Sequence, residues 1–213
     1  MQKQQNIIDC YNKTAKNYAY KFIDELNKKH LDRILLKRFV DENIQKEKLI
    51  DLGCGPGQTT KFIADQELTD IIGIDISEKM INEARKLHPH LAFDTGDMLN
   101  MKYRDLTFGS AIAFYSIVHF NYKQIKKAFK EIKRILKEDG HFLFSYHVGE
   151  GVVHMEEFLE HKVNIDFYFF DTSKIIEIVQ ETGFEIIDVI ERQPYKDVEY
   201  PSKRAYLWIK KPK

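Results

Sequence analysis

The sequence predicts an α/β fold: a mostly parallel, seven-stranded sheet between two helical layers, with an antiparallel hairpin at one edge. Short apolar runs alternate with amphipathic segments along most of the 213 residues, which is typical of parallel strands joined by helices. The last two apolar runs, 185–190 and 204–209, have no helical segment between them and therefore predict the hairpin. A chain of this length can bury one core, so residues 1–213 are expected to form a single domain.

The first half of the chain supplies most of this alternation. Apolar residues recur at spacings of three and four within 7–22 and 31–39, which predicts two helices. Ser77 is a candidate N-cap, and the helix after it ends at His88-Pro89 because a residue before proline avoids the α region. The other segments expected here are a helix at 59–65 and strands at 48–52, 71–75 and 91–93.

The second half contains the most apolar run, 111–118, which suits a fully buried central strand. A helix over 125–136 follows, with Gly140 as its expected C′ residue, and then a strand over 141–147. A last helix, capped by Asp171-Thr172-Ser173 and ended by Gly183, precedes the closing hairpin.

Residues 148–170 interrupt the alternation, and we expect them to form an inserted lid that carries specificity. His154, Glu157 and His161 would share one face if this segment were helical, but surface charge explains them as well as a metal site does, so no metal is predicted. The aromatic run at 167–170 is expected to anchor the lid.

Composition limits the partners. Thirty-three basic residues balance thirty-three acidic ones, so no global field favours nucleic acid or an anionic membrane surface. No stretch approaches the roughly 18 apolar residues of a membrane span. Cys10 and Cys54 are too few for a disulfide framework or a cysteine zinc site. A cytoplasmic protein is expected.

A glycine-rich turn follows the first predicted strand, with the pattern Asp51-x-Gly53-x-Gly55-x-Gly57. Glycines let backbone N–H groups approach a ligand closely, so the pattern indicates a nucleotide-like ligand. The dinucleotide fingerprint requires glycine where this chain has Gln58, and an acidic residue before the glycines suits a more cationic ligand. Taken alone, the pattern also fits a tight turn between strand and helix.

Acidic residues follow the next two strands. Asp75 ends the second strand, 18 residues after Gly57, where an acid in such folds accepts hydrogen bonds from ribose hydroxyls. Asp97 follows the third strand, with Met98 beside it. With these spacings the chain resembles the class I S-adenosylmethionine-dependent methyltransferases of the small-molecule type, and residues 11–18 resemble the opening helix of that family.

The resemblance covers nearly the whole chain and implies a Rossmann-like fold that binds S-adenosylmethionine. It implies that tyrosines of the opening helix close over the cofactor, that Asp97 reads adenine and that methionines form apolar walls. The cofactor-binding residues expected from the resemblance are Tyr11, Tyr18, Asp51, Gly53, Gly55, Gly57, Asp75, Ile76, Met80, Asp97, Met98 and Tyr115.

Two histidines are candidates for a catalytic base. His119 and His147 close the fourth and fifth predicted strands, at the sheet edge where ligands bind. Methyl transfer needs a base only if the acceptor must lose a proton, so a structural role is equally open for each.

The function expected is methyl transfer to a small-molecule acceptor by a monomer or homodimer that binds neither DNA nor membrane. An RNA or protein methyltransferase is the first alternative, although the chain shows no basic face or recognition domain. A non-catalytic S-adenosylmethionine-binding protein is the second, because a fold and a cofactor site do not prove a reaction.

Overall fold

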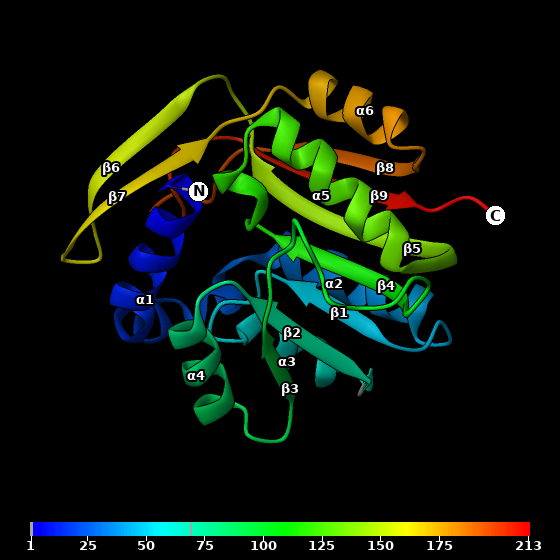
Figure 1. The fold of residues 1–213 in the computed structure, drawn as a ribbon, viewed down its shortest axis with the longest axis horizontal. Coiled ribbons are helices and arrows are strands. Elements are labelled where there is room, and N and C mark those ends of the chain that lie inside the picture. Colours follow the sequence, from blue (N-terminus) through cyan, green and yellow to red (C-terminus); the bar gives the residue numbers. More distant parts are fainter. Residues whose placement is uncertain (1, 69) are drawn as a thin grey trace.

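The computed structural model describes residues 2–68 and 70–213 (Figure 1). Its strands are β1 (Leu49–Leu52), β2 (Ile71–Asp75), β3 (Ala92–Thr95), β4 (Phe108–Phe114), β5 (Leu136–His147), β6 (Val152–Phe158), β7 (His161–Tyr168), β8 (Glu185–Arg192) and β9 (Arg204–Lys210). Its helices are α1 (Gln2–Phe22), α2 (His30–Asn43), α3 (Gln58–Ala64), α4 (Glu78–Leu87), α5 (Tyr122–Ile135) and α6 (Thr172–Glu181), with short 3-10 helices η1 (Glu25–Lys28) and η2 (Ile117–His119).

Seven strands form one sheet in the order β3-β2-β1-β4-β5-β9-β8. The first five are mutually parallel, whereas β9 runs antiparallel to both β5 and β8. The predicted fold class is therefore confirmed, including the edge hairpin. The strand order reverses between β1 and β4, and in open α/β sheets ligands bind at such a reversal, beyond the carboxyl ends of the strands.

Side chains of the central strands alternate between two hydrophobic cores, as the pleat requires. On β5, Phe142 and Phe144 pack with residues of α5 and α6, whereas Leu143 between them packs with Leu36 and Phe39 of α2. All of these side chains are fully buried. The sheet thus has a helical layer on each face, with α5 and α6 in front of it in the view of Figure 1.

Two expected boundaries were wrong. The central strand ends at Phe114 rather than 118, because Tyr115 takes a left-handed φ of 53° and the chain turns into η2. Gly140 is not a helix cap: α5 ends at Ile135, and the chain enters β5 directly, pairing Leu136 with Phe108. The early start of β5 places Gly140 inside the strand.

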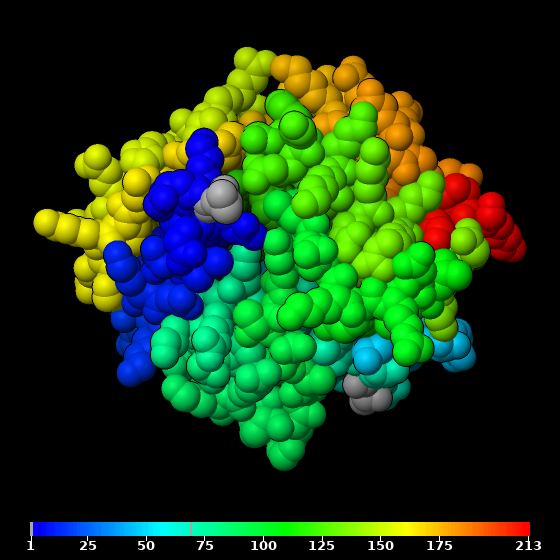
Figure 2. All heavy atoms as spheres, in the orientation of Figure 1, coloured from blue at the N-terminus to red at the C-terminus, as the bar shows by residue number. Residues whose placement is uncertain are grey.

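The insertion at 148–170 is a β-hairpin, β6–β7, and not a helix. It forms a second, two-stranded sheet whose base is closed by a bridge between Val148 and Phe170. Helix α1 packs against both β7 and α4, and Figure 2 shows it in blue between the yellow hairpin and the teal segment of α4. Helix α1 and the hairpin together cover the carboxyl edge of the sheet. Within the described residues, no helix has the length and apolar character to cross a membrane.

Candidate functional site

Two adjoining cavities open at the carboxyl edge of the sheet, a smaller one of about 100 Å³ and a larger one of about 310 Å³. The smaller lies over the ends of β2 and β3, and the larger extends under the β6–β7 hairpin. The residues that line both cavities are Tyr11, Tyr18, Gly53, Gly55, Phe114 and Tyr115. A molecule in one cavity would therefore meet a molecule in the other at the glycine turn.

The glycines of the turn differ in what surrounds them. Gly55 has a φ of +54°, and a Cβ built on it would meet nothing nearer than Tyr18 Cε1 at 3.8 Å, so the space beside it belongs to the cavities. Gly57 lines neither cavity, and a Cβ there would lie 2.7 Å from Phe93 Cζ. Packing against Phe93 explains Gly57 without a ligand.

Asp75 projects from the end of β2 into the smaller cavity and holds the glycine turn in place. Its carboxylate accepts hydrogen bonds from the Gly55 N–H at 3.0 Å and the Ser77 N–H at 2.8 Å. Burial raises the pKa of Asp75 to about 6, against the lowering effect of these N–H groups. The carboxylate is therefore ionised at neutral pH and retains acceptor capacity toward the cavity.

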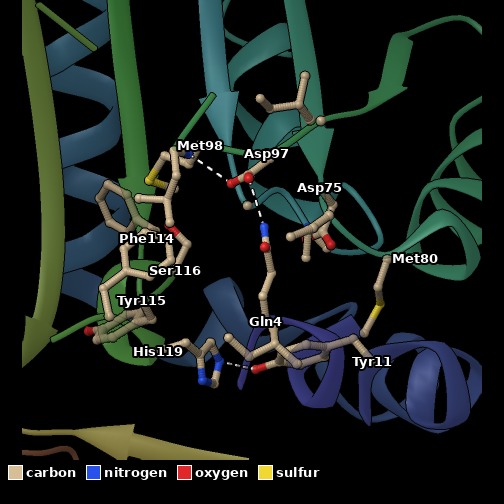
Figure 3. A pocket seen from close by; sticks show the side chains of 18 of the residues that line it. Gln4, Tyr11, Asp75, Met80, Asp97, Met98, Phe114, Tyr115, Ser116 and His119 are labelled. Carbon is tan, nitrogen blue, oxygen red and sulfur yellow. Dashed lines mark hydrogen bonds between the residues drawn. The ribbon is translucent and has the colours of Figure 1, made fainter. Parts of the chain in front are cut away.

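Asp97 faces the same cavity, and the side chain of Gln4 reaches it from α1 (Figure 3). The Gln4 amide donates to Asp97 Oδ2 at 2.7 Å, and the Leu99 N–H donates to Oδ1 at 2.8 Å. Apolar walls surround this pair, and they include the sequence-predicted Ile76, Met80 and Met98. No sequence pattern singled out Gln4, because its role depends on how α1 docks.

Asp51 and Gln58 present acceptors to the larger cavity beside the glycine turn. Thr60 donates to Asp51 at 2.6 Å, yet burial raises the pKa of Asp51 to about 7. The Gln58 amide nitrogen donates to Glu25, which fixes the side-chain orientation, and the buried Oε1 has no hydrogen-bond partner among the described residues. An unpartnered buried oxygen beside a carboxylate suits a cationic ligand group.

His119 lies in η2 and uses both ring nitrogens. Its Nδ1 lies 3.1 Å from the Asp166 carbonyl, which only accepts, so Nδ1 carries the proton. Its Nε2 lies 2.6 Å from the Tyr11 hydroxyl and accepts from it (Figure 3). Burial lowers the pKa of His119 to about 4, so the ring is neutral at pH 7. This geometry makes His119 a support for Tyr11, and a base role stays a prediction.

His147 ends β5 and lines the larger cavity. Ser202 Oγ lies 2.9 Å from His147 Nδ1 and accepts from Arg204 Nη1 at 2.9 Å, and its hydroxyl can either donate to Nδ1 or accept from it. Burial, aided by the nearby Arg204 charge, lowers the pKa of His147 to about 3. The ring is therefore neutral at pH 7, and a base role again stays a prediction.

The larger cavity combines an apolar roof with a charged end. The hairpin supplies Val153, Met155, Phe158 and Phe167, and the segment just after it adds Phe169. The charged residues are Glu25, Lys29, Asp32, Asp51, Glu199 and Arg204, which come from both ends of the chain. The sequence pattern identified only Asp51 of this group, because the others meet only after folding.

The histidines of the insertion do not form the helical face considered above. His154 lies on β6 and His161 begins β7. Across residues 2–68 and 70–213, no group of three or more histidine, cysteine or acidic residues is arranged to hold a metal ion. His154 instead pairs with Asp166 at 2.8 Å.

Comparison with known proteins agrees with this geometry. Residues 49–140, from β1 into β5, match a family model described as a methyltransferase domain. A magnesium protoporphyrin IX methyltransferase from Synechocystis, solved with bound S-adenosylmethionine, superposes with a TM-score of 0.73 at 14% identity over 99% of this chain and 98% of that one. The chain thus has the fold of S-adenosylmethionine-dependent methyltransferases, and its residues 49–140 are similar to the methyltransferase-domain family.

The curated relatives are longer than this chain, and the match covers only part of each. An uncharacterised protein of Methanocaldococcus jannaschii is 30% identical over 145 residues, which are 67% of this chain and 52% of that protein. Norajmaline N-methyltransferase of Rauvolfia serpentina is 26% identical over 63% of this chain and 55% of its own length. This chain thus spans about half the length of the curated relatives it matches.

Proposed function

We propose that the chain transfers a methyl group from S-adenosylmethionine to a small-molecule acceptor. The observation that carries the proposal is the junction of two cavities at one glycine turn, with the carboxylates of Asp75 and Asp97 on one side and a larger cavity roofed by the hairpin on the other. S-adenosylmethionine supplies a methyl group on a positively charged sulfur.

The residues present fit that molecule. Asp75 would accept from the ribose hydroxyls and Asp97 from the adenine amino group, which is a donor like the Gln4 amide now bound there. Asp51 and the unpartnered Gln58 Oε1 would accept from the methionine ammonium. The unfilled space beside Gly55 would admit the chain between them.

The chain's contribution to the reaction is positioning. Tyr11, Tyr18 and Tyr115 stand where the cavities meet and would hold the reacting atoms in line, an effect that can supply roughly 7–11 kcal/mol. S-adenosylmethionine held by these residues would supply an electrophilic methyl group to the acceptor atom, and sulfur would keep the electron pair of the carbon–sulfur bond. A proton displaced from the acceptor passes to water.

A small acceptor is supported by the size of the larger cavity, about 310 Å³, and by the apolar hairpin side chains that roof it. Two of the relatives are named as norajmaline N-methyltransferase and as an O-methyltransferase. The main competing possibility is a protein that binds S-adenosylmethionine without transferring methyl. A solved neighbour named as a [4+2]-cyclase has the same fold, with a TM-score of 0.65 at 19% identity, so fold alone does not specify methyl transfer.

The proposal is tested by S-adenosylmethionine calorimetry on the wild type and on Asp75→Ala. We expect the substitution to cost about 1.5–3 kcal/mol, or roughly 10- to 150-fold in affinity, because it removes charge-assisted hydrogen bonds. Asp94→Ala, which removes an exposed carboxylate from neighbouring β3, is the matched control and should change nothing. Equal affinity in Asp75→Ala would contradict the cofactor site.

The pH dependence follows from the same carboxylate. Because the pKa of Asp75 is raised to about 6, its ionised form is present above that value and is lost as the pH falls through it. Wild-type affinity for S-adenosylmethionine should therefore decline between about pH 7 and 5. Release of S-adenosylhomocysteine in a metabolite extract would distinguish an enzyme from a non-catalytic binder.

A further inference from the structure

Arg204 forms part of the wall of the larger cavity and has unused hydrogen-bonding capacity. The residue is 3% exposed, and its Nη1 donates to the Tyr200 carbonyl at 2.7 Å and to Ser202. Its Nε is buried without a hydrogen-bond partner in the part of the chain that the structure describes. A buried guanidinium N–H without an acceptor is costly, so an acceptor on a ligand would relieve that cost.

His147 adds a second donor on the same wall. Ser202 Oγ links the two residues, since it accepts from Arg204 Nη1 and lies 2.9 Å from His147 Nδ1. With Ser202 as the donor to Nδ1, the proton of the neutral ring is on Nε2, and both Arg204 and His147 line the larger cavity. This wall therefore offers N–H donors from two side chains.

The acidic residues at this end are already committed to other partners. Glu199 accepts from Arg192 at 2.6 and 2.8 Å and from the Tyr195 N–H at 2.8 Å. Asp32 accepts from the Tyr206 hydroxyl at 2.6 Å and from Arg192 at 3.0 Å. Glu199 Oε1 lies 3.5 Å from Arg204 Nε and pairs with its charge without forming a hydrogen bond.

Lys29 also lines the larger cavity, and its charge, like that of Arg204, is paired with a carboxylate. Its ammonium bonds to Glu25 at 2.6 Å and lies 4.8 Å from the centre of the Tyr115 ring. Arg204 and His147 differ from Lys29 because Ser202 links them on one wall.

Aromatic rings adjoin these donors. The ring centre of Phe169 lies 5.4 Å from that of His147 and 5.9 Å from that of Tyr200. The ring centre of Tyr115, which lines both cavities, lies 5.6 Å from that of His147. Flat apolar surface beside hydrogen-bond donors suits a planar molecule with an anionic oxygen group at one end.

We infer that the methyl acceptor is an aromatic carboxylate, whose carboxylate binds Arg204 and His147 and whose ring packs against Phe169. This inference rests on the proposed function and specifies its substrate class. The carboxylate anchors the acceptor at the far wall, and the atom to be methylated points toward Tyr115, where the two cavities meet.

The test compares matched acid and amide pairs, namely indole-3-acetate with indole-3-acetamide and 4-aminobenzoate with 4-aminobenzamide. Binding to the purified full chain is measured by calorimetry, with and without S-adenosylhomocysteine. We expect at least one acid to bind about tenfold or more tightly than its amide, because only the acid makes charged hydrogen bonds with Arg204. If no acid binds more tightly than its amide, the inference is overturned.

Substitutions at the wall test which residues cause the preference for the acid over the amide. Arg204→Gln should reduce the acid-to-amide ratio to near one, and His147→Leu should reduce it severalfold. Lys203→Gln, which removes a charge from the adjacent exposed residue, should preserve the ratio. Because Arg204 also supports the backbone at Tyr200, His147→Leu provides an independent test if Arg204→Gln does not fold. An unchanged ratio in His147→Leu and in a folded Arg204→Gln would contradict the assigned wall.

Binding of S-adenosylhomocysteine distinguishes a failure of the proposed function from a failure of the inferred substrate class. If S-adenosylhomocysteine fails to bind the wild type, the proposed function is wrong. The titrations of acids and amides in the absence of S-adenosylhomocysteine still show whether the acid is preferred. If S-adenosylhomocysteine binds but no acid is preferred, only the substrate class is wrong.

Discussion

The two cavities are built in different ways. The smaller one takes its polar groups from the loops that follow successive parallel strands, where Asp75 ends β2 and Asp97 follows β3. The larger one gathers residues from Tyr11 to Arg204, through α1, the hairpin and the start of β9. The parallel sheet alone fixes most of the first, whereas the second requires segments added around the sheet. Helix α1 lines both cavities, whereas the hairpin lines only the larger one, so we expect changes to the hairpin to alter the acceptor and leave cofactor binding nearly intact.

Removing the β6–β7 hairpin should give the largest difference between the two cavities, because it should abolish acceptor positioning and spare cofactor binding. Residues 152–168 can be replaced by a short glycine-serine linker, because the Phe169 N–H already donates to the Gly151 carbonyl at 3.1 Å. Val148 and Phe170 should remain, since Phe170 is 1% exposed and belongs to the main core. We expect methyl transfer to fall at least roughly 100-fold through lost positioning.

The same variant should bind S-adenosylmethionine with an affinity within about tenfold of the wild type. The loss is expected because α1 no longer packs against β7. Calorimetry and S-adenosylhomocysteine release measure the two effects. Retained turnover with an unchanged acceptor profile would place specificity outside the hairpin.

Gly55→Val should weaken binding of the cofactor. A β-branched side chain at a φ of +54° would be strained and would fill the space between the cavities, at a cost of up to about 3 kcal/mol, or roughly 100-fold in S-adenosylmethionine affinity. Gly151→Val is the matched control, because Gly151 also has a left-handed φ, of +93°, but a Cβ added there would meet no atom within 4 Å. Calorimetry on both folded variants tests the prediction, and equal affinities would show that the turn has no contact with the cofactor.

Asp51→Asn should weaken cofactor binding and stabilise the ligand-free protein. Because burial raises the folded-state pKa of Asp51 to about 7, the folded chain holds a proton there that the unfolded chain releases near pH 4. The stability contributed by Asp51 therefore falls as the pH rises from about 4 to 7. The variant should gain about 2–4 kcal/mol at pH 8 and little near pH 4, measured by urea unfolding.

Asp65→Asn is the control for that comparison, since Asp65 is an exposed carboxylate paired with Lys61. A variant Asp51→Asn that is less stable than the wild type at pH 8 would mean that the carboxylate is stabilised in the folded state.

Gln4→Ala should have the smallest effect and the opposite sign. The Gln4 amide occupies Asp97 Oδ2, so its removal frees an acceptor that the adenine amino group would use. We expect affinity for S-adenosylmethionine to rise by about 1 kcal/mol, or roughly fivefold. Gln5→Ala, from the same turn of α1, removes only a bond to Asp9 and should leave the affinity unchanged. A loss of affinity in Gln4→Ala would show that Gln4 contacts the cofactor directly.

Local patterns in the sequence were enough to predict the order of strands and helices. Apolar runs such as 71–75 and amphipathic segments such as 125–136 have periods set by backbone geometry, which does not depend on distant residues. The hairpin at 148–170 could not be predicted in this way, because β6 is mostly exposed and β7 mostly half-buried, and neither strand is a buried apolar run. The end of β4 could not be predicted either, because an apolar run does not reveal the left-handed φ of Tyr115.

The sequence by itself determined the carboxyl-edge acids, because Asp51 and Asp75 belong to strands whose parallel pairing brings their ends together. The tertiary structure decided which side chains complete the site. Gln4 reaches Asp97 across 93 positions and Tyr11 reaches His119 across 108, and neither pair follows from any local period. Arg204 and His147 likewise meet only because β9 inserts antiparallel beside β5. Contacts of this kind depend on how separate elements dock, and that is set by the packing of the whole core.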